Sequence, residues 1–359
     1  MRYGCYWLLL GVLLLVGCGG GEVVLLPTLM PTAAWPAVDG QMVAGVAVPA
    51  TYTPEAFPTL ASPTIPPTAT PTPVATATPI ATATPTATPT LPPTETPTPA
   101  PTIPWSPVPQ QTACDGTGYV YRGAFPSRQG GVRGFRAYIP PCYGHDGRVY
   151  PVLYLFHGSV QTDSHWQDLG LVGYMDGAIA NGFFPPFIVV MPNNGDLGNM
   201  TSGGPNSIEG VTNDELIPYV EQYFCAWRSR SGRSLGGISR GGYWALAIAF
   251  RSPGRFRSVS GHSSHLRLET DVPEYNPLAT YATANLGGLR IWMDWGEEDF
   301  LRPGQEQLHT SLTAAGIPHE VHVNPGGHSN GYWGTHIATY LSWHARAWPR
   351  DRNSYPLCE

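Results

Sequence analysis

Residues 111–359 are predicted to form an α/β fold, a mostly parallel sheet with helices on both faces. Two continuous apolar runs, VYPVLYLFHG and PFIVVMPN, are typical of buried central strands. Helical patterns separate the later strand patterns, and a sharp glycine turn, GGISRGG, joins one strand to an Ala-rich helix. In such folds reactive side chains collect at the carboxyl ends of the strands.

The remaining elements follow from local patterns. SRQGG predicts a hairpin turn between the first two strands, and acidic residues after Thr212 or Asn213 predict a capped helix start. Pro253 ends the helix after the glycine turn, and Gly316 ends a later one. Strands are expected at 119–125, 132–140, 149–158, 186–193, before Ser239, and at 256–260, 289–296 and 319–325. Helices are expected at 170–181, 213–227, after Ser239, and at 304–315 and 332–348.

The N-terminus is typical of an exported protein. Arg2 precedes an apolar run over residues 6–16 that is shorter than the roughly 20 residues a membrane-spanning helix needs. Leu-Val-Gly-Cys18 resembles the lipobox of bacterial lipoproteins, which implies a signal peptide over 1–17 and a lipid on Cys18. The alternative is a plain secretory signal with an incidental cysteine. Both predict an extracytoplasmic protein, and the lipobox predicts membrane anchoring.

Residues 18–110 are predicted to be a disordered linker. Thr, Pro and Ala dominate this stretch, so it contains too few large apolar side chains to offset the entropy of ordering. We expect an extended stalk, partly polyproline II, that serves as a plain spacer. Its threonines are also possible sugar acceptors.

Charge and cysteine content narrow the function classes. The net charge is -6 with no basic cluster, which gives nucleic-acid binding no electrostatic support. Four cysteines remain in the domain, which allows three disulfide connectivities. The predicted hairpin brings Cys114 and Cys142 nearly opposite each other, which favours a disulfide between them. Cys225 and Cys358 would then pair by default. Their wide spacing argues against a metal site. The favoured pairs are Cys114–Cys142 and Cys225–Cys358.

Ser239 is the predicted nucleophile. Gly-Ile-Ser239-Arg-Gly lies between an apolar strand and an Ala-rich helix, the context of a nucleophile elbow. With 42 glycines in 359 residues, chance alone gives about 0.3 such patterns, so context must decide. A second match centres on Ser329, but Asn-Pro-Gly precedes it and no acid–histidine pair follows.

The partners of Ser239 should follow it in the order acid, then histidine. Asp299 comes just after the strand LRIWMDWG, with Asp294, Glu297 and Glu298 as alternatives. His328 follows the last strand and is the expected general base. Asp299 would fix the histidine tautomer and stabilise the imidazolium.

An oxyanion hole needs two backbone N–H donors. The residue after the nucleophile, Arg240, supplies one. The loop after LYLFHG supplies the other, with Ser159 as the expected donor and His157 and Gly158 shaping the turn. A strand-ending turn without catalytic function has the same pattern.

Taken together, the domain resembles the esterase D family of α/β-hydrolases, which includes S-formylglutathione hydrolases, feruloyl and acetylxylan esterases, enterochelin-esterase-like proteins and the antigen 85 mycolyltransferases. The resemblance rests on PVLYLFHG, PPFIVVMPN, GGISRGGYWAL, Gly296-x-x-Asp299 and PGGHSNGYW, in family order over most of 119–348. It implies an α/β-hydrolase fold and serine hydrolase chemistry on esters, without a metal or organic cofactor. Arg240 stands where many relatives have Met, which would change the polarity of the acyl pocket.

The substrate is less constrained. Four aromatic side chains are candidates for a stacking platform or for core and pocket wall: Trp166, Trp295, Tyr243 and Trp333. His157 and His262 are further candidates for the substrate pocket. His265, in the same SGHSSH segment as His262, either borders the pocket or belongs to a surface loop.

Three functions fit the sequence. The first is an extracytoplasmic esterase for small-molecule or glycan-linked esters, with polysaccharide acyl groups and siderophore-like esters as candidates. The second is an acyltransferase that passes the same acyl group to a sugar or lipid hydroxyl. The third is a binding protein on an inactive hydrolase fold, which need not keep the serine, acid and histidine in order. The sequence leaves the oligomeric state open.

Overall fold

The computed structural model describes Cys114 and residues 116–358. The predicted signal peptide, Cys18 and the linker lie outside the described residues. Of the helices within the described part, none is long and apolar enough to cross a membrane.

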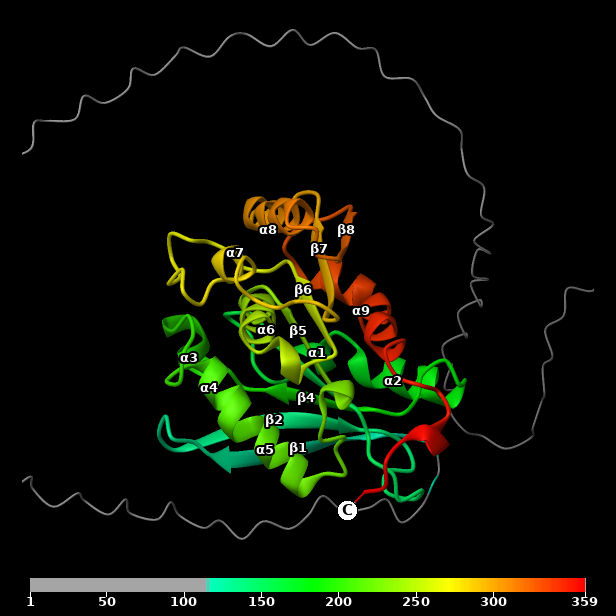
Figure 1. Ribbon diagram of the computed structural model, residues 1–359. Helices are drawn as coiled ribbons and strands as arrows, with labels where there is room; N and C mark the ends of the chain where they lie inside the picture. Colours follow the sequence, from blue (N-terminus) through cyan, green and yellow to red (C-terminus); the bar gives the residue numbers. More distant parts are fainter. Residues whose placement is uncertain (1–113, 115, 359) are drawn as a thin grey trace, which may run out of the picture. The chain divides into compact units, whose positions relative to one another are not determined.

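The described residues form one eight-stranded sheet with the order β1-β2-β4-β3-β5-β6-β7-β8 (Figure 1). β1 and β2 form an antiparallel hairpin, β2 runs antiparallel to β4, and the other neighbours are parallel. The strands are β1 (Tyr119–Pro126), β2 (Val132–Ile139), β3 (Val152–Phe156), β4 (Ile188–Pro192), β5 (Arg233–Ile238), β6 (Ser258–His262), β7 (Arg290–Gly296) and β8 (Glu320–Asn324). The predicted fold class is confirmed.

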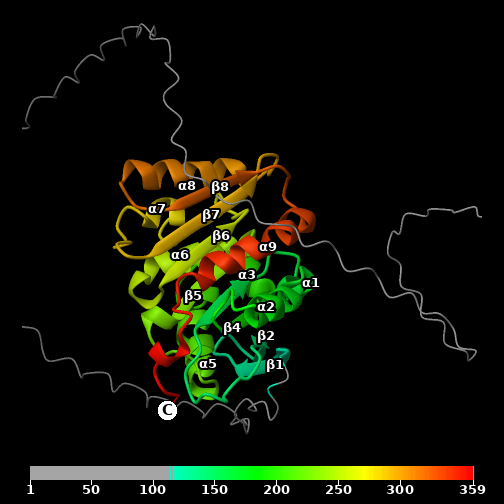
Figure 2. The same ribbon diagram turned by 90° about the vertical axis from the view of Figure 1, so that its right-hand side faces the viewer.

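Helices cover both faces of this sheet. α1, α2 and α9 lie on one face, and α4, α5, α6 and α8 lie on the other (Figures 1 and 2). The helices are α1 (His165–Asp168), α2 (Leu171–Ala180), α3 (Gly195–Met200), α4 (Ile208–Val211), α5 (Ile217–Tyr223), α6 (Arg240–Arg251), α7 (Pro277–Thr280), α8 (Arg302–Ala314) and α9 (Asn330–Ala345).

The core divides into two layers because side chains alternate along each buried strand. In β3, Val152, Tyr154 and Phe156 pack with α5 and α6, whereas Leu153 and Leu155 pack with α2 and α9. All five side chains are buried, which explains why β3 reads as a continuous apolar run.

One helix begins earlier than predicted. The helical segment starts at Ile208, and its N-cap is Ser207, whose hydroxyl accepts a hydrogen bond from Glu209 N–H, so Thr212 and Asn213 are not the cap. A π-helical turn over Thr212–Leu216 separates α4 from α5. Pro218, which lacks an N–H to donate, follows directly in α5.

Strand β6 lies two residues later than predicted. A 3₁₀ turn over Pro253–Arg255 comes before the strand, which therefore begins later in the chain. In the ladder between β5 and β6, Ser234 pairs with Ser258 and Ile238 pairs with His262. This register carries His262 to the strand end beside Ser239. The short helices α1, α3 and α7 had no predicted counterpart.

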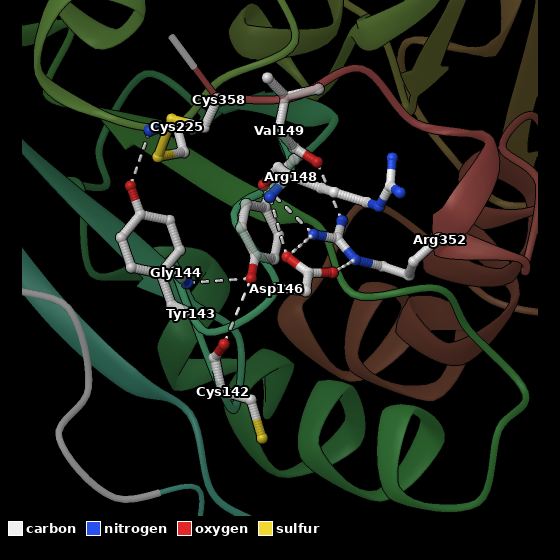
Figure 3. The surroundings of a disulfide bond; sticks show 10 residues. Cys142, Tyr143, Gly144, Asp146, Arg148, Val149, Cys225, Arg352 and Cys358 are labelled. Atoms are coloured by element: carbon white, nitrogen blue, oxygen red, sulfur yellow. Dashed lines mark hydrogen bonds and ion pairs between the residues drawn. A yellow bond between two sulfur atoms is a disulfide. The ribbon is translucent and has the colours of Figure 1, made fainter.

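Both favoured disulfides are present, Cys114–Cys142 and Cys225–Cys358. Figure 3 shows the surroundings of Cys225–Cys358, which fixes the C-terminal segment to the domain. Nearby, the Arg352 guanidinium binds both Asp146 carboxylate oxygens at 2.7 Å and the Val149 carbonyl at 2.9 Å. The C-terminal segment is therefore held by one covalent bond and by charge-assisted hydrogen bonds.

The two disulfides should stabilise the domain to different degrees. Cys225–Cys358 closes a loop of 133 residues, and Cys114–Cys142 closes one of 28 residues. The chain-entropy model therefore predicts that removing Cys225–Cys358 lowers the free energy of unfolding by about 1.4 kcal/mol more than removing Cys114–Cys142. Urea titrations of the two double Cys→Ser variants measure this difference. Equal losses, or a larger loss from Cys114–Cys142, would contradict it.

Candidate active site

The predicted nucleophile, Ser239, lies in a strained turn between β5 and α6. Its backbone has φ 57° and ψ -119°, a conformation that non-glycine residues rarely adopt. Glycines on both sides allow the turn, since a Cβ on Gly237 would collide with the carbonyl of Gly241, and one on Gly241 would collide with the carbonyl of Phe156. The predicted nucleophile elbow is therefore the geometry that this sequence forms.

The end of β6 holds this turn in place. Ser239 N–H donates to the carbonyl of His262 at 2.8 Å, and His265 N–H donates to the carbonyl of Ser239 at 3.0 Å. These two main-chain bonds fix the serine backbone on both sides, so the strained conformation is maintained by the neighbouring strand.

The structure brings together all three residues predicted for a catalytic triad. His328, on the loop between β8 and α9, has its Nε2 3.0 Å from Ser239 Oγ. Its Nδ1 lies 3.1 Å and 3.2 Å from the two carboxylate oxygens of Asp299, which follows β7. A histidine bonded in this way can take a proton from the serine while the carboxylate fixes its tautomer.

Asp299 is buried, yet the pKa of its carboxyl group is lowered, which favours the charged form. Burial raises the pKa of its carboxyl group, but hydrogen bonds from His328, Ser263 and the Leu301 N–H outweigh that effect and leave the pKa below its ordinary value. The Leu301 N–H bond measures 2.8 Å. The carboxylate is thus ionised when it faces the imidazole.

Sequence reasoning missed Ser263 as a supporting residue. Ser263 is fully buried, has φ 50°, and accepts a hydrogen bond from Trp333 Nε1 at 3.0 Å while bonding to the Asp299 carboxylate. The Trp333 ring packs edge-on against His328, with ring centroids 4.9 Å apart. Trp333 and Ser263 therefore support the acid and the base from behind. The only sequence signal for Ser263 was its position just after a strand end.

The loop after β3 lies against the nucleophile. A Cβ built on Gly158 would lie 3.3 Å from Ser239 Cβ, so glycine permits the close approach. The next residue, Ser159, is exposed, and its carbonyl accepts from the Asn199 side chain at 2.9 Å. Arg240 is the first residue of α6, where a backbone N–H has no partner within the helix. The two predicted oxyanion donors thus lie on the two segments that flank Ser239.

His157 is part of this turn and not a pocket contact, which corrects our prediction. Its buried imidazole bonds through Nδ1 to the Gly158 carbonyl at 2.7 Å and accepts at Nε2 from Asn194 N–H at 2.9 Å. Burial lowers the pKa of His157. The side chain fixes the loop that carries Ser159.

The Arg240 side chain is engaged inside the domain. Its guanidinium is buried, binds Asp271 at 2.7 Å and the carbonyls of Gly198 and Thr201 at 2.9 Å and 2.6 Å, and lies over the Tyr243 ring. The expectation that it changes pocket polarity is therefore wrong. It ties the α3 segment and the loop after β6 to the elbow.

Of the two interpretations of the aromatic side chains, the structure supports the core and contradicts the stacking platform, because all four are buried: Trp166, Trp295, Tyr243 and Trp333. Trp166 donates to the Phe156 carbonyl at 3.2 Å and packs against His262.

His262, likewise a predicted pocket residue, is fully buried, with its Nδ1 2.5 Å from Asp294. Asp294 also accepts from the hydroxyls of Tyr332 and Tyr340, so its carboxylate is fully engaged away from His328. Glu297 and Glu298 are exposed. Of the alternatives to Asp299, none contacts the imidazole of His328 among the hydrogen bonds of the described residues.

Ser329 has a structural role. Its side chain caps α9 by accepting from Tyr332 N–H at 3.3 Å. Of the two Gly-x-Ser-x-Gly matches, only the one at Ser239 contacts a histidine.

Similarity to known proteins shows the family of this chain. The model of the family described as "Putative esterase" matches residues 127–344, more than half of the chain. The chain belongs to this esterase family. It is 30% identical to an esterase of Mycobacterium tuberculosis over 243 residues, 54% of this chain and 52% of that protein. It is 36% identical over 128 residues to an endo-1,4-β-xylanase/feruloyl esterase of Xylanibacter ruminicola, 33% of this chain and 18% of that protein.

Solved structures share the fold of this esterase-family chain. A ferulic acid esterase aligns with TM-score 0.59 at 22% identity, covering 65% of this chain and 99% of that one. An S-formylglutathione hydrolase from Staphylococcus aureus aligns with TM-score 0.57 at 17% identity, covering 64% and 99%. The chain spans about half the length of the Mycobacterium tuberculosis relative.

Ser263→Ala tests the support behind the triad. Losing a hydrogen bond to a charged group costs about 1.5–3 kcal/mol, which corresponds to a loss in kcat of roughly 10- to 100-fold on any ester that the protein turns over. Ser264→Ala is the matched control, since the buried Ser264 hydroxyl has no hydrogen-bond partner. Equal activities of the two variants would show that Ser263 does not position Asp299.

Proposed function

We propose that this protein is an extracytoplasmic serine esterase that hydrolyses carboxylic esters through an acyl-enzyme on Ser239. The observation that carries the proposal is the hydrogen-bonded chain from Ser239 Oγ through His328 to Asp299. The family supports ester chemistry, and relatives named as esterases support a small-molecule or glycan-linked substrate.

The reaction follows from the positions of these groups. Ser239 Oγ attacks the ester carbonyl carbon while its proton passes to His328 Nε2, and Asp299 stabilises the resulting imidazolium. The backbone N–H groups of Arg240 and Ser159 would receive the oxyanion. Collapse breaks the bond to the alcohol oxygen, which takes the proton from His328 Nε2. Water then attacks the carbonyl carbon of the acyl-enzyme and gives its proton to His328 Nε2. The bond to Ser239 Oγ breaks, the serine takes the proton from His328 Nε2, and the acid is released.

An acyltransferase would use the same acyl-enzyme with an alcohol in place of water. The choice between the two lies in which acceptor reaches the acyl group, so products formed with an added sugar or alcohol separate them. A binding protein without catalysis would need neither the bonded triad nor the strained Ser239 backbone, and the strain costs stability.

The extracytoplasmic location is part of the proposal. Its support is the Leu-Val-Gly-Cys18 motif after an apolar run and the two disulfides, since disulfides persist in oxidising compartments.

Replacing the nucleophile or the base should remove turnover. Ser239→Ala and His328→Ala are each expected to lower kcat by about 10⁴- to 10⁶-fold on p-nitrophenyl acetate, with the fold retained by circular dichroism. Ser329→Ala, in the other Gly-x-Ser-x-Gly match, should keep most of the turnover. Activity retained by Ser239→Ala would reject the assigned nucleophile.

The lipid anchor has a separate test. In bacterial cells, Cys18→Ser should move the protein from the membrane fraction to the soluble fraction, because the residue that carries the lipid is lost. Immunoblots of the two fractions measure this distribution. Unchanged membrane association would refute the anchor while leaving the esterase proposal intact.

A further inference from the structure

A pocket of about 430 Å³ lies between the segments that follow β6 and β7, in the size range of small-molecule sites. One wall is the segment 266–270 after β6, and the other is the segment 300–307, which follows β7 and enters α8. The lining residues include Leu266, Arg267, Leu268, Glu269, Phe300 and Leu301.

Both walls are direct continuations of catalytic segments. The Phe300 ring lies 4.7 Å from the His328 ring, and Leu301 N–H bonds to the Asp299 carboxylate. On the other wall, Leu266 follows His265, whose N–H bonds to the Ser239 carbonyl. The walls of the pocket are therefore joined to the triad segments, and Phe300 is the wall residue that contacts His328.

The walls combine apolar and charged groups. Phe300 is 65% exposed and Leu268 is 38% exposed, so both offer apolar surface that a ligand would cover. The exposed side chains of Arg267 and Glu269 give the same wall a polar rim. An occupant with an apolar body would gain from burial against Phe300 and Leu268.

The side of the ester that enters this pocket follows from the chemistry. His328 Nε2 must reach the leaving alcohol oxygen to protonate it, so the alcohol part of the ester lies on the histidine side of Ser239. Phe300, which contacts the imidazole, lines the pocket on that same side. The oxyanion donors, Arg240 and Ser159, lie on other segments.

We propose that this pocket binds the alcohol group of the substrate and selects alcohols with an apolar aryl or alkyl body. The inference rests on the proposed esterase function and adds the substrate class of the same site. Phe300 and Leu268 would be the residues that determine specificity.

The test uses esters that share one acyl group. We compare kcat/KM for ethyl acetate and 2-phenylethyl acetate with the full chain. The wild type should prefer 2-phenylethyl acetate by about tenfold or more, because burying a phenyl group contributes more than 1.4 kcal/mol. Phe300→Ala should reduce this preference at least fivefold, and Phe300→Leu should retain most of it. Phe183→Ala is the matched control: Phe183 is 60% exposed and precedes β4, which β3, β5 and β6 separate from β7 in the sheet.

Each outcome decides the proposal. A preference unchanged in Phe300→Ala, or equally reduced in Phe183→Ala, overturns the assignment of the pocket. A parallel series, methyl acetate against methyl 3-phenylpropanoate, varies the acyl group instead. A loss of discrimination confined to that series would place the acyl group in the pocket and overturn the proposal for the alcohol. If the wild type hydrolyses none of these esters and a fluorophosphonate does not label Ser239, the esterase function itself fails.

Discussion

The two main-chain hydrogen bonds that join Ser239 to His262, the last residue of β6, and to His265 in the loop after it are the constraint on which the site depends. They hold the serine at φ 57°, where its own conformational preference would not keep it. Because α6 begins at the next residue, the same bonds also fix the direction of the helix and of the Arg240 N–H. The nucleophile and one predicted oxyanion donor are therefore set by the register of β5 against β6.

The end of β6 is itself held by polar groups buried between the sheet and α9. Asp294 on β7 binds His262 on β6 and the hydroxyls of Tyr332 and Tyr340 on α9. Buried polar groups that are fully bonded favour one arrangement over others, since any shift would leave a charge without partners. Through Asp294, the β6 end that holds the serine and the helix that follows His328 are positioned together.

Much of the site was predictable, because its signals are local or follow chain order. The glycine turn marked Ser239, and the ends of two later strands marked Asp299 and His328, which the structure brings within hydrogen-bond distance of one another. For the aromatic residues near these motifs the sequence left core and site open, because apolar patterns do not reveal which of the two a side chain faces. Trp333 shows this well: it is buried, yet supports His328 from behind. The helix start at Ile208 was missed because its cap precedes a π-helical turn.

The most direct test of this account is to label the protein with a fluorophosphonate and map the modified peptide. An activated serine attacks such probes, whereas an ordinary hydroxyl does not. The account predicts one modified residue, Ser239, and labelling that disappears in His328→Ala. Labelling at Ser329, or none in a protein that circular dichroism shows to be folded, would contradict it.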